Sequence, residues 1–162
     1  VFGKRGNLVV GIEPSYYRGY LEKLAELGIV KWRPPKKEAR ETKFIEEEYR
    51  PYEQPGSGVI TGRLKHQGFV FMNPRTSYSE EWFQKSNIEH RELETPDPRA
   101  INYLRMAVTT EGGDFSFINL PSGDYLLGAR DAISGWSHAK VSVKDGKTTV
   151  AKLTISGWGD ME

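Results

Sequence analysis

Short runs of β-branched and aromatic residues, each closed by a turn signal, recur along the chain from Gly58 onward. Apolar and polar residues alternate in several of these runs, which is the period of a strand with one buried face. Short strands at regular spacing are typical of an antiparallel sandwich or barrel. The runs cover residues 59–64, 69–72, 103–108, 115–117, 125–129, 139–143 and 149–155. We therefore predict a mainly β protein in which residues 58–162 form a seven-stranded antiparallel β-sandwich.

Glycine and proline stand where consecutive strands must reverse direction. Gly112-Gly113 can supply the positive φ of a tight turn, and Pro121 followed by Gly123 predicts another. The pair Asp145-Gly146 is a strong signal for a type I′ hairpin. These turns lead us to expect hairpins between the flanking strands.

The regular spacing of strands is interrupted over residues 76–101. Trp82 and Phe83 lie there among charged residues, and a Pro96-Asp97-Pro98 stop follows. Insertions of this length between strands are often functional. We predict that Trp82 and Phe83 contact a partner, because their neighbours provide no apolar core.

The first 57 residues have a different character and are expected to form an N-terminal arm. A helix is predicted at about residues 15–27, with Tyr17, Leu21 and Leu24 on one stripe and Gly28 as a left-handed C-cap. The stretch 33–57 is read as an extended charged linker, since 12 of the 21 residues from 33 to 53 are charged.

The apolar residues of the arm are expected to be buried against a protein surface. Two further short apolar pieces, around residues 8–10 and 29–32, flank the predicted helix. Either these pieces pack on their own domain or they dock on another protein subunit, and the sequence leaves both open. If they dock, the arm's binding residues are Leu8, Val10, Tyr17, Leu21, Leu24 and Trp32.

One run of residues carries a resemblance to a known family. Thr109, Gly113, Phe115, Phe117, Leu120, Pro121, Gly123 and Tyr125 match the pattern T-x-x-x-G-x-F-x-F-x-x-L-P-x-G-x-Y. On this run the chain resembles the carboxypeptidase regulatory-like family over residues 58–155. The resemblance implies a transthyretin-like (prealbumin-like) seven-stranded sandwich. Family members serve as noncatalytic accessory or adhesive modules of exported bacterial proteins and as a domain of metallocarboxypeptidases.

Few residues offer catalytic or metal-binding chemistry. The absence of cysteine excludes disulfides, thiolate ligands and cysteine nucleophiles from the sequence given. His66, His90 and His138 lack the spacing of zinc peptidase motifs, so we expect them at the surface. Lys140 and Lys152 alternate with apolar strand residues and are expected to be exposed. We expect no catalytic residue, no metal and no cofactor.

These observations predict a noncatalytic interaction module of an exported bacterial envelope or surface assembly. Its partners would be other protein subunits, including further copies of the chain, bound through the arm and the insertion. A signal segment is expected upstream of Val1, giving an extracytoplasmic location. The formal net charge of +1 argues against nucleic acid as a partner, and no apolar run is long enough for a membrane span.

A second function stays open beside the first. Aromatic side chains in loops at the end of a sandwich can stack on sugars or anchor a peptide. Trp82, Phe83 and Trp136 are the candidates, with Trp136 as the ligand-stacking residue. An enzyme is a third alternative, for which metal analysis is the simplest test.

Overall fold

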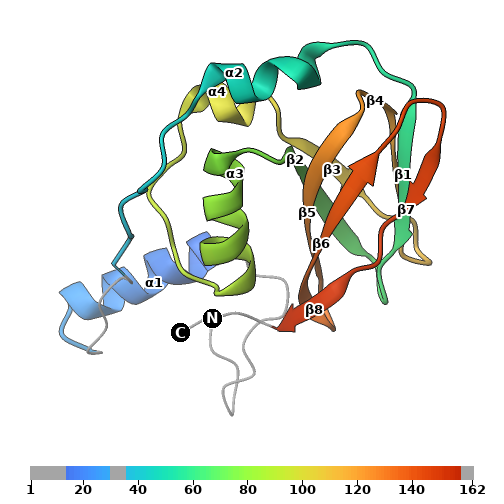
Figure 1. Cartoon of the computed structure of the whole chain (residues 1–162). Coiled ribbons are helices and arrows are strands. Elements are labelled where there is room, and N and C mark those ends of the chain that lie inside the picture. Colours follow the sequence, from blue (N-terminus) through green and yellow to red (C-terminus); the bar gives the residue numbers. More distant parts are fainter. Residues whose placement is uncertain (1–13, 30–35, 158–162) are drawn as a thin grey trace. The chain divides into compact units, whose positions relative to one another are not determined.

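A computed structural model of the chain describes residues 14–29 and 36–157 (Figure 1). The chain divides into two units, one of residues 1–36 with the last two residues and one of residues 37–160. Each unit is described by itself. No helix in the described ranges is long and apolar enough to cross a membrane.

The first unit contains helix α1 (Pro14–Glu26), close to the predicted bounds. The helix ends as the sequence indicates. Gly28 has φ 73°, and its N–H donates to Ala25 O at 3.0 Å. The Ile29 N–H donates to Leu24 O at 3.0 Å. This pair of bonds is a Schellman cap, which satisfies carbonyls at the end of the helix.

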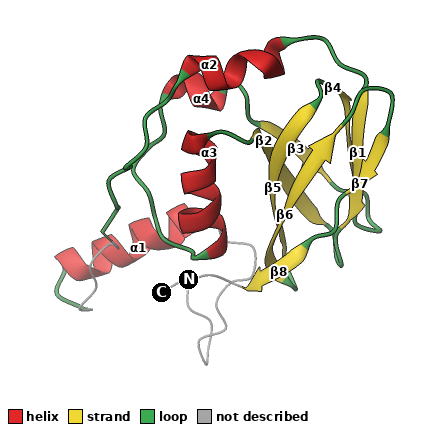
Figure 2. Ribbon diagram, in the orientation of Figure 1, coloured by secondary structure: helices red, strands yellow, loops and turns green. Residues whose placement is uncertain are grey.

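The second unit is built on two sheets (Figure 2). The smaller has the strand order β4-β1-β7, and the larger has the order β3-β2-β5-β6-β8. The strands of the smaller sheet are β1 (Gly58–Arg63), β4 (Asp114–Leu120) and β7 (Thr148–Val150). The larger sheet contains β2 (Gly68–Pro74), β3 (Arg105–Val108), β5 (Gly123–Asp131), β6 (Gly135–Val143) and β8 (Thr154–Gly157). The protein is therefore mainly β, as expected.

The core lies between the two sheets and is filled from alternate strand positions. Phe115 and Phe117 on β4 are buried, as are Val141 and Val143 on β6, while the residues between them are exposed. Further buried members of the core are Ile60, Leu64, Val70, Met72, Leu120, Tyr125, Leu127, Ala129, Ala139 and Ala151. Burial of this apolar surface is the main stabilising contribution.

The last predicted strand, residues 149–155, is wrong as a single element. It divides into β7 and β8, which belong to different sheets, so the described residues form eight strands. The division falls at Ala151, which is buried and donates its N–H to Thr61 O at 2.7 Å. The expectation of an entirely antiparallel sandwich is also corrected, because β7 pairs with β1 in parallel.

The three predicted turns form, but none of them closes a hairpin. Gly113 and Gly146 have φ of 90° and 72°, and Gly123 has φ 150°. Each turn connects strands of different sheets: β3 with β4, β4 with β5, and β6 with β7. A turn signal specifies reversal of the chain, whereas sheet membership depends on which backbone lies alongside. Among the described strands, β5 and β6 are paired neighbours joined directly by a turn, so they form a hairpin.

The stretch expected to be an extended linker is helical in part and packs on the sandwich. It contains α2 (Glu46–Tyr49) and the 3₁₀-helix η2 (Arg50–Glu53). Tyr49 is 2% exposed. Its ring stacks on Phe44 with centroids 4.7 Å apart and lies 4.6 Å from the ring of Tyr103. One of these neighbours, Tyr103, is distant in sequence, so composition alone could not indicate the packing of Tyr49.

The insertion between β2 and β3 is also helical. It comprises α3 (Ser77–Glu81), a π-helical segment η3 (Trp82–Ile88) and α4 (Pro98–Ile101). Thr76 caps α3, accepting from Ser79 N–H at 3.1 Å while the Ser79 hydroxyl accepts from Thr76 N–H at 2.8 Å. From there the helix runs alongside β5 and β6 and packs on the outer face of the larger sheet (Figure 1).

The residues of the family-like run all have structural roles. A Cβ on Gly113 would lie 2.2 Å from Leu64 O, and one on Gly123 would lie 2.8 Å from the Tyr52 ring. The Thr109 hydroxyl accepts from Gly68 N–H at 2.9 Å. Tyr125 is buried and donates its hydroxyl to Pro121 O at 2.7 Å. The run therefore holds the ends of β3, β4 and β5 in place.

Candidate functional site

Pairing across the larger sheet places side chains in rows on its outer face, away from the core. Phe69 on β2 is the register partner of Arg130 on β5, which is in turn the partner of Trp136 on β6. Val108 on β3 extends the row at the edge of the sheet. Directly paired residues point to the same side of a sheet. From β3 to β6 the row therefore consists of an aliphatic side chain, an aromatic ring, a cationic guanidinium and a second aromatic ring.

A second row lies one step along the strands. Phe71 pairs with Gly128, and Gly128 pairs with His138. Gly128 has no side chain, so η3 can pack closely against the backbone of β5 at this position. A Cβ there would lie 3.1 Å from the Trp82 ring and 2.6 Å from the amide oxygen of Asn87. Trp82 is thereby held over β5, beside the two rows.

We use the name aromatic face for Phe69, Phe71, Trp82, Arg130 and Trp136. All five are half-buried. The Phe69 and Phe71 rings contact edge to face with centroids 5.0 Å apart. The Arg130 guanidinium lies 5.2 Å from the centre of the Trp136 ring, within the range of a cation–π contact. The face combines flat apolar rings with the hydrogen-bond donors of one guanidinium.

His90 and Trp136 come together at the side of this face near β8. The two rings have centroids 6.5 Å apart. A ring nitrogen of His90, Nε2, lies 2.8 Å from Ser156 O. The backbone of His90 has φ 57°, a left-handed conformation that non-glycine residues rarely adopt. The contact between His90 and Ser156 therefore holds the chain that follows η3 against β8.

Buried polar atoms lie between η3 and the sheet, next to the aromatic face. Both amide atoms of Asn87 and Nδ1 of His138 are buried without a hydrogen-bond partner among the described residues. Burial, and secondarily the charge of Lys140, lowers the pKa of His138. The rings of His138 and Phe83 lie nearly perpendicular to each other, with centroids 5.5 Å apart. His138 is therefore only partly exposed, with its Nδ1 atom buried in the contact between η3 and the sheet.

Glu81 anchors the helix to residues 41–42. Its carboxylate accepts from Glu41 N–H at 2.8 Å, from the Thr42 hydroxyl at 2.8 Å and from Lys85 Nζ at 3.0 Å. Burial by itself would raise the pKa of Glu81, but these hydrogen bonds and the lysine charge outweigh it and lower the pKa to about 2. Glu81 is thus a charged group held almost entirely within the protein.

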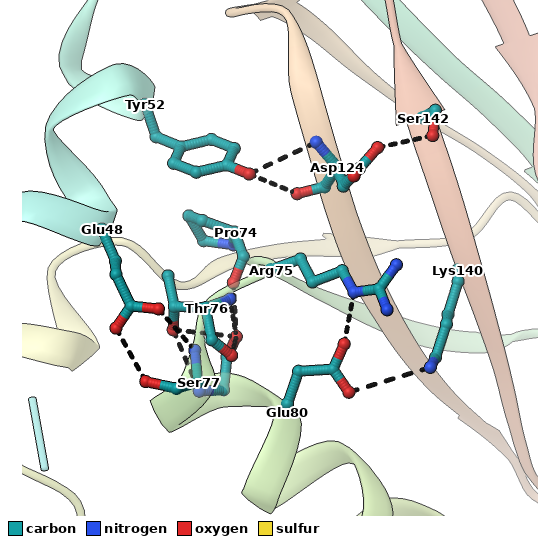
Figure 3. A network of polar contacts seen from close by, with 11 residues as sticks. Glu48, Tyr52, Pro74, Arg75, Thr76, Ser77, Glu80, Asp124, Lys140 and Ser142 are labelled. Atoms are coloured by element: carbon teal, nitrogen blue, oxygen red, sulfur yellow. Dashed lines mark hydrogen bonds and ion pairs between the residues drawn. The ribbon is translucent and has the colours of Figure 1, made fainter. Parts of the chain in front are cut away.

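A second set of polar contacts fixes α3 to the sheet and to α2 (Figure 3). Glu80 accepts from Arg75 Nε and lies 3.7 Å from Lys140 Nζ on β6. Glu48 on α2 accepts from the backbone N–H of Ser77 at 3.0 Å and from its hydroxyl at 2.7 Å. A negatively charged side chain near the first turn of a helix stabilises the helix, because the N-terminal end of the helix dipole is positive. The helix that carries Trp82 is therefore held at several points.

The structure assigns different places to the residues predicted from the sequence. The prediction that Phe83 contacts a partner is wrong, because it is 1% exposed and packs inward against β6. Trp82 and Trp136 belong to the aromatic face, but they lie on η3 and on β6 and not in loops as expected. Leu21 and Leu24 are half-buried within the first unit. Leu8, Val10, Trp32 and the side chain of Tyr17 lie outside the described residues.

Phe69, Phe71 and Arg130 were not singled out from the sequence. Phe69 and Phe71 alternate with Val70 and Met72, and that alternation showed that one pair must face outward. Nothing local indicated that Arg130 and Trp136 would lie in the same row as Phe69. Lys140 and Lys152 are exposed, as expected, and His66 and His90 are partly exposed. The described residues contain no cluster of three or more side chains able to hold a metal ion.

Comparisons with known proteins show a likeness to a solved structure. No family model matches the chain, and no curated protein matches it. Among solved structures, it is similar to a Pseudomonas aeruginosa protein described as a candidate carbohydrate-binding protein, with 23% identity and a TM-score of 0.51. The match covers 68% of this chain and 97% of that one. At this identity the likeness establishes a shared fold for the matched part of the chain.

Proposed function

We propose that this chain is a noncatalytic binding module that binds carbohydrate on the aromatic face. The observation that carries the proposal is the row of Phe69, Arg130 and Trp136, aligned by strand pairing and left half-exposed beside the helix. Aromatic rings offer flat apolar surface, and a guanidinium offers several donors in a fixed plane. A sugar ring presents apolar C–H faces and hydroxyl groups, so it suits both.

Two further points support carbohydrate as the ligand class. The strands and the anchored helix hold these side chains on rigid elements, which limits the entropy lost on binding. The solved structure with the same fold is described as a candidate carbohydrate-binding protein. A peptide is the other ligand considered for these aromatic residues, and the test below separates the two.

The test is direct binding of soluble oligosaccharides, found by glycan array and measured by titration calorimetry. Trp136→Ala and Phe69→Ala should each weaken binding by about tenfold or more, since a buried aromatic contact contributes on the order of 1–2 kcal/mol. Ile118→Ala is the matched control, because Ile118 is an exposed apolar residue on β4 of the other sheet. Sugar affinity unchanged in both variants, or binding of peptides alone, would refute the proposal.

We also propose that the sandwich is of the transthyretin-like type found in the carboxypeptidase regulatory-like family. Support comes from the family-like run, whose members all take part in turns or the core. Eight described strands, one of them parallel, are a departure from the family's seven. An experimental structure, compared strand by strand with family members, would decide the type.

A second candidate function is docking of the first unit onto another protein subunit. The observation in its favour is that Leu27 and Ile29, at the end of α1, are 62% and 65% exposed. The test compares sedimentation of the whole chain with that of residues 37–162. A larger assembly formed only by the whole chain supports docking, and equal assembly of both argues against it.

The location we propose is extracytoplasmic, within an exported bacterial envelope assembly. It rests on the resemblance to modules of exported proteins. Fractionation of cells that produce the full-length protein is the test, and recovery in the cytoplasmic fraction alone would contradict it.

A further inference from the structure

Four exposed apolar side chains lie in the segment that runs from the end of α4 through β3, a strand at the edge of the larger sheet. Ile101, Leu104, Met106 and Val108 are 50%, 38%, 60% and 76% exposed, within a segment of eight residues. The last two belong to β3 and lie on the same side of the sheet as Phe71 and Phe69, their register partners. Exposed apolar side chains that lie beside one another on a sheet, as Met106 and Val108 do with Phe71 and Phe69, mark a candidate interaction site.

The backbone of β3 is also open at this edge. Among the described strands, β3 pairs only with β2. Thr109 donates its N–H to Gly68 O at 2.9 Å, which continues the β2–β3 register. In an antiparallel ladder, inward and outward hydrogen-bonding positions alternate. The N–H and C=O groups of Met106 and Val108 therefore point away from β2, ready to pair with another strand.

We propose that a second copy of this chain pairs with β3 through its own β3, antiparallel about a two-fold axis at Ala107. In this register Met106 lies opposite Val108 of the second copy, and the reverse pair is equivalent. Both pairs are hydrogen-bonded pairs, so the N–H and C=O groups of Met106 and Val108 that point away from β2 form hydrogen bonds with the second copy. Ala107 lies opposite its own copy in the close, non-hydrogen-bonded position, which its small side chain permits.

The chemistry of the edge is self-complementary, which is why a second copy is favoured over a foreign strand. A closed two-fold contact brings the same patch of each subunit together. On the outer face, each Met106–Val108 pair would lie between Phe71 of one copy and Phe69 of the other. Arg105 would lie opposite Thr109, so no like charges are directly opposed. Arg105 is further held by its own chain, donating to Ile118 O at 3.2 Å.

The size of the contact sets the expected strength. A four-residue strand with a few flanking apolar side chains falls below the roughly 1,200 Å² of a standard specific interface. We therefore expect a weak dimer, with a dissociation constant above about 1 µM. The proposal is independent of carbohydrate, and no sugar is present in its test.

The test is sedimentation equilibrium of the full chain from about 5 µM to about 1 mM, with amide hydrogen exchange at both ends of the range. Concentration-dependent dimerisation is expected, with slower exchange at Met106 and Val108 as concentration rises. Val108→Lys, which places a charge on an edge strand, should weaken dimerisation by about tenfold or more. Val150→Lys is the control, because Val150 is 65% exposed on the other sheet.

Two results would overturn the proposal. One is a monomer throughout the concentration range. The other is association that Val108→Lys leaves unchanged while the amides of Met106 and Val108 exchange equally fast at all concentrations. The exchange measurement uses the unmodified chain, so it decides the matter even if the variant folds poorly.

Discussion

The hydroxyl of Tyr52 donates to the carbonyl oxygen of Asp124 at 2.8 Å and accepts from the Asp124 N–H at 3.3 Å (Figure 3). The Tyr52 ring also meets the Tyr125 ring with centroids 5.2 Å apart. These contacts join η2 to the start of β5 across 72 residues. Residues 37–57 are consequently part of the folded second unit.

Truncation should reveal this boundary. A chain beginning at residue 37 is expected to keep the melting temperature of the second unit, whereas one beginning at residue 58 should lose several degrees or fail to fold. Tyr49→Ala in the full chain should cost about 3–5 kcal/mol, because it leaves a cavity among packed rings. Tyr49→Phe, which removes only a hydroxyl bonded to Thr76 at 3.0 Å, should cost about 1 kcal/mol. Urea unfolding measures both, and equal stability of all these chains would contradict the packing described.

Acid should loosen the helix through Glu81. Its pKa is lowered to about 2 in the folded protein, so its stabilising contribution is complete above its ordinary value of 4.5. That contribution is lost progressively as pH falls from 4.5 toward 2, where the folded state must take up the proton. Glu81→Gln should remove about 2–3 kcal/mol at pH 7 and flatten this part of the pH dependence.

The control for this experiment is Glu47→Gln, since Glu47 is exposed on α2. Its effect should stay within about 0.5 kcal/mol. If Glu81→Gln and Glu47→Gln change the unfolding free energy equally at pH 7, the proposed anchor is wrong.

Two glycines with positive φ should respond differently to alanine. Gly146→Ala adds a Cβ with nothing within 4 Å, so only backbone strain of about 1 kcal/mol is expected. Gly113→Ala adds the same kind of strain and places a Cβ 2.2 Å from Leu64 O, so a loss above about 3 kcal/mol is expected. Thermal melts of the two variants measure the difference, and similar values would show that the Leu64 backbone can move aside.

Asn87 is expected to tolerate loss of its amide. Its side-chain atoms are buried and unpartnered within the described structure, so Asn87→Leu removes polar groups that gain nothing from the contact. The unfolding free energy should stay the same or rise by about 1 kcal/mol. Asn102→Leu, at an exposed position, is the control. A loss above about 1 kcal/mol for Asn87→Leu would show that the amide has a partner in solution.

Local signals in the sequence were sufficient for most of the strands, for the helix α1 and for the positions of the turns, but not for the division of residues 149–155 into β7 and β8. Phe115 and Phe117 alternate with polar residues, and this period follows directly from the geometry of an extended chain. Gly28, Gly113 and Gly146 adopt positive φ because that conformation costs a glycine least. Such features depend on residues within a few positions of one another.

Other features depended on partners far along the chain and could not be predicted. The burial of Tyr49 requires Tyr103, and the inward position of Phe83 requires β6. Trp82 and Phe83 are adjacent in sequence and equally apolar. One is buried and the other helps to form the aromatic face, because the register of the helix against Gly128 decides between them.

The sequence by itself determined a mainly β chain with its turns and the alternating positions that fill a core, because backbone conformation and side-chain period are local properties. Tertiary structure alone decided which strands pair, and therefore that the three turns connect the two sheets and that Phe69, Arg130 and Trp136 share a row. Strand pairing joins backbones distant in sequence through hydrogen bonds that any residue except proline can donate, so side-chain identity along one segment does not specify its partner.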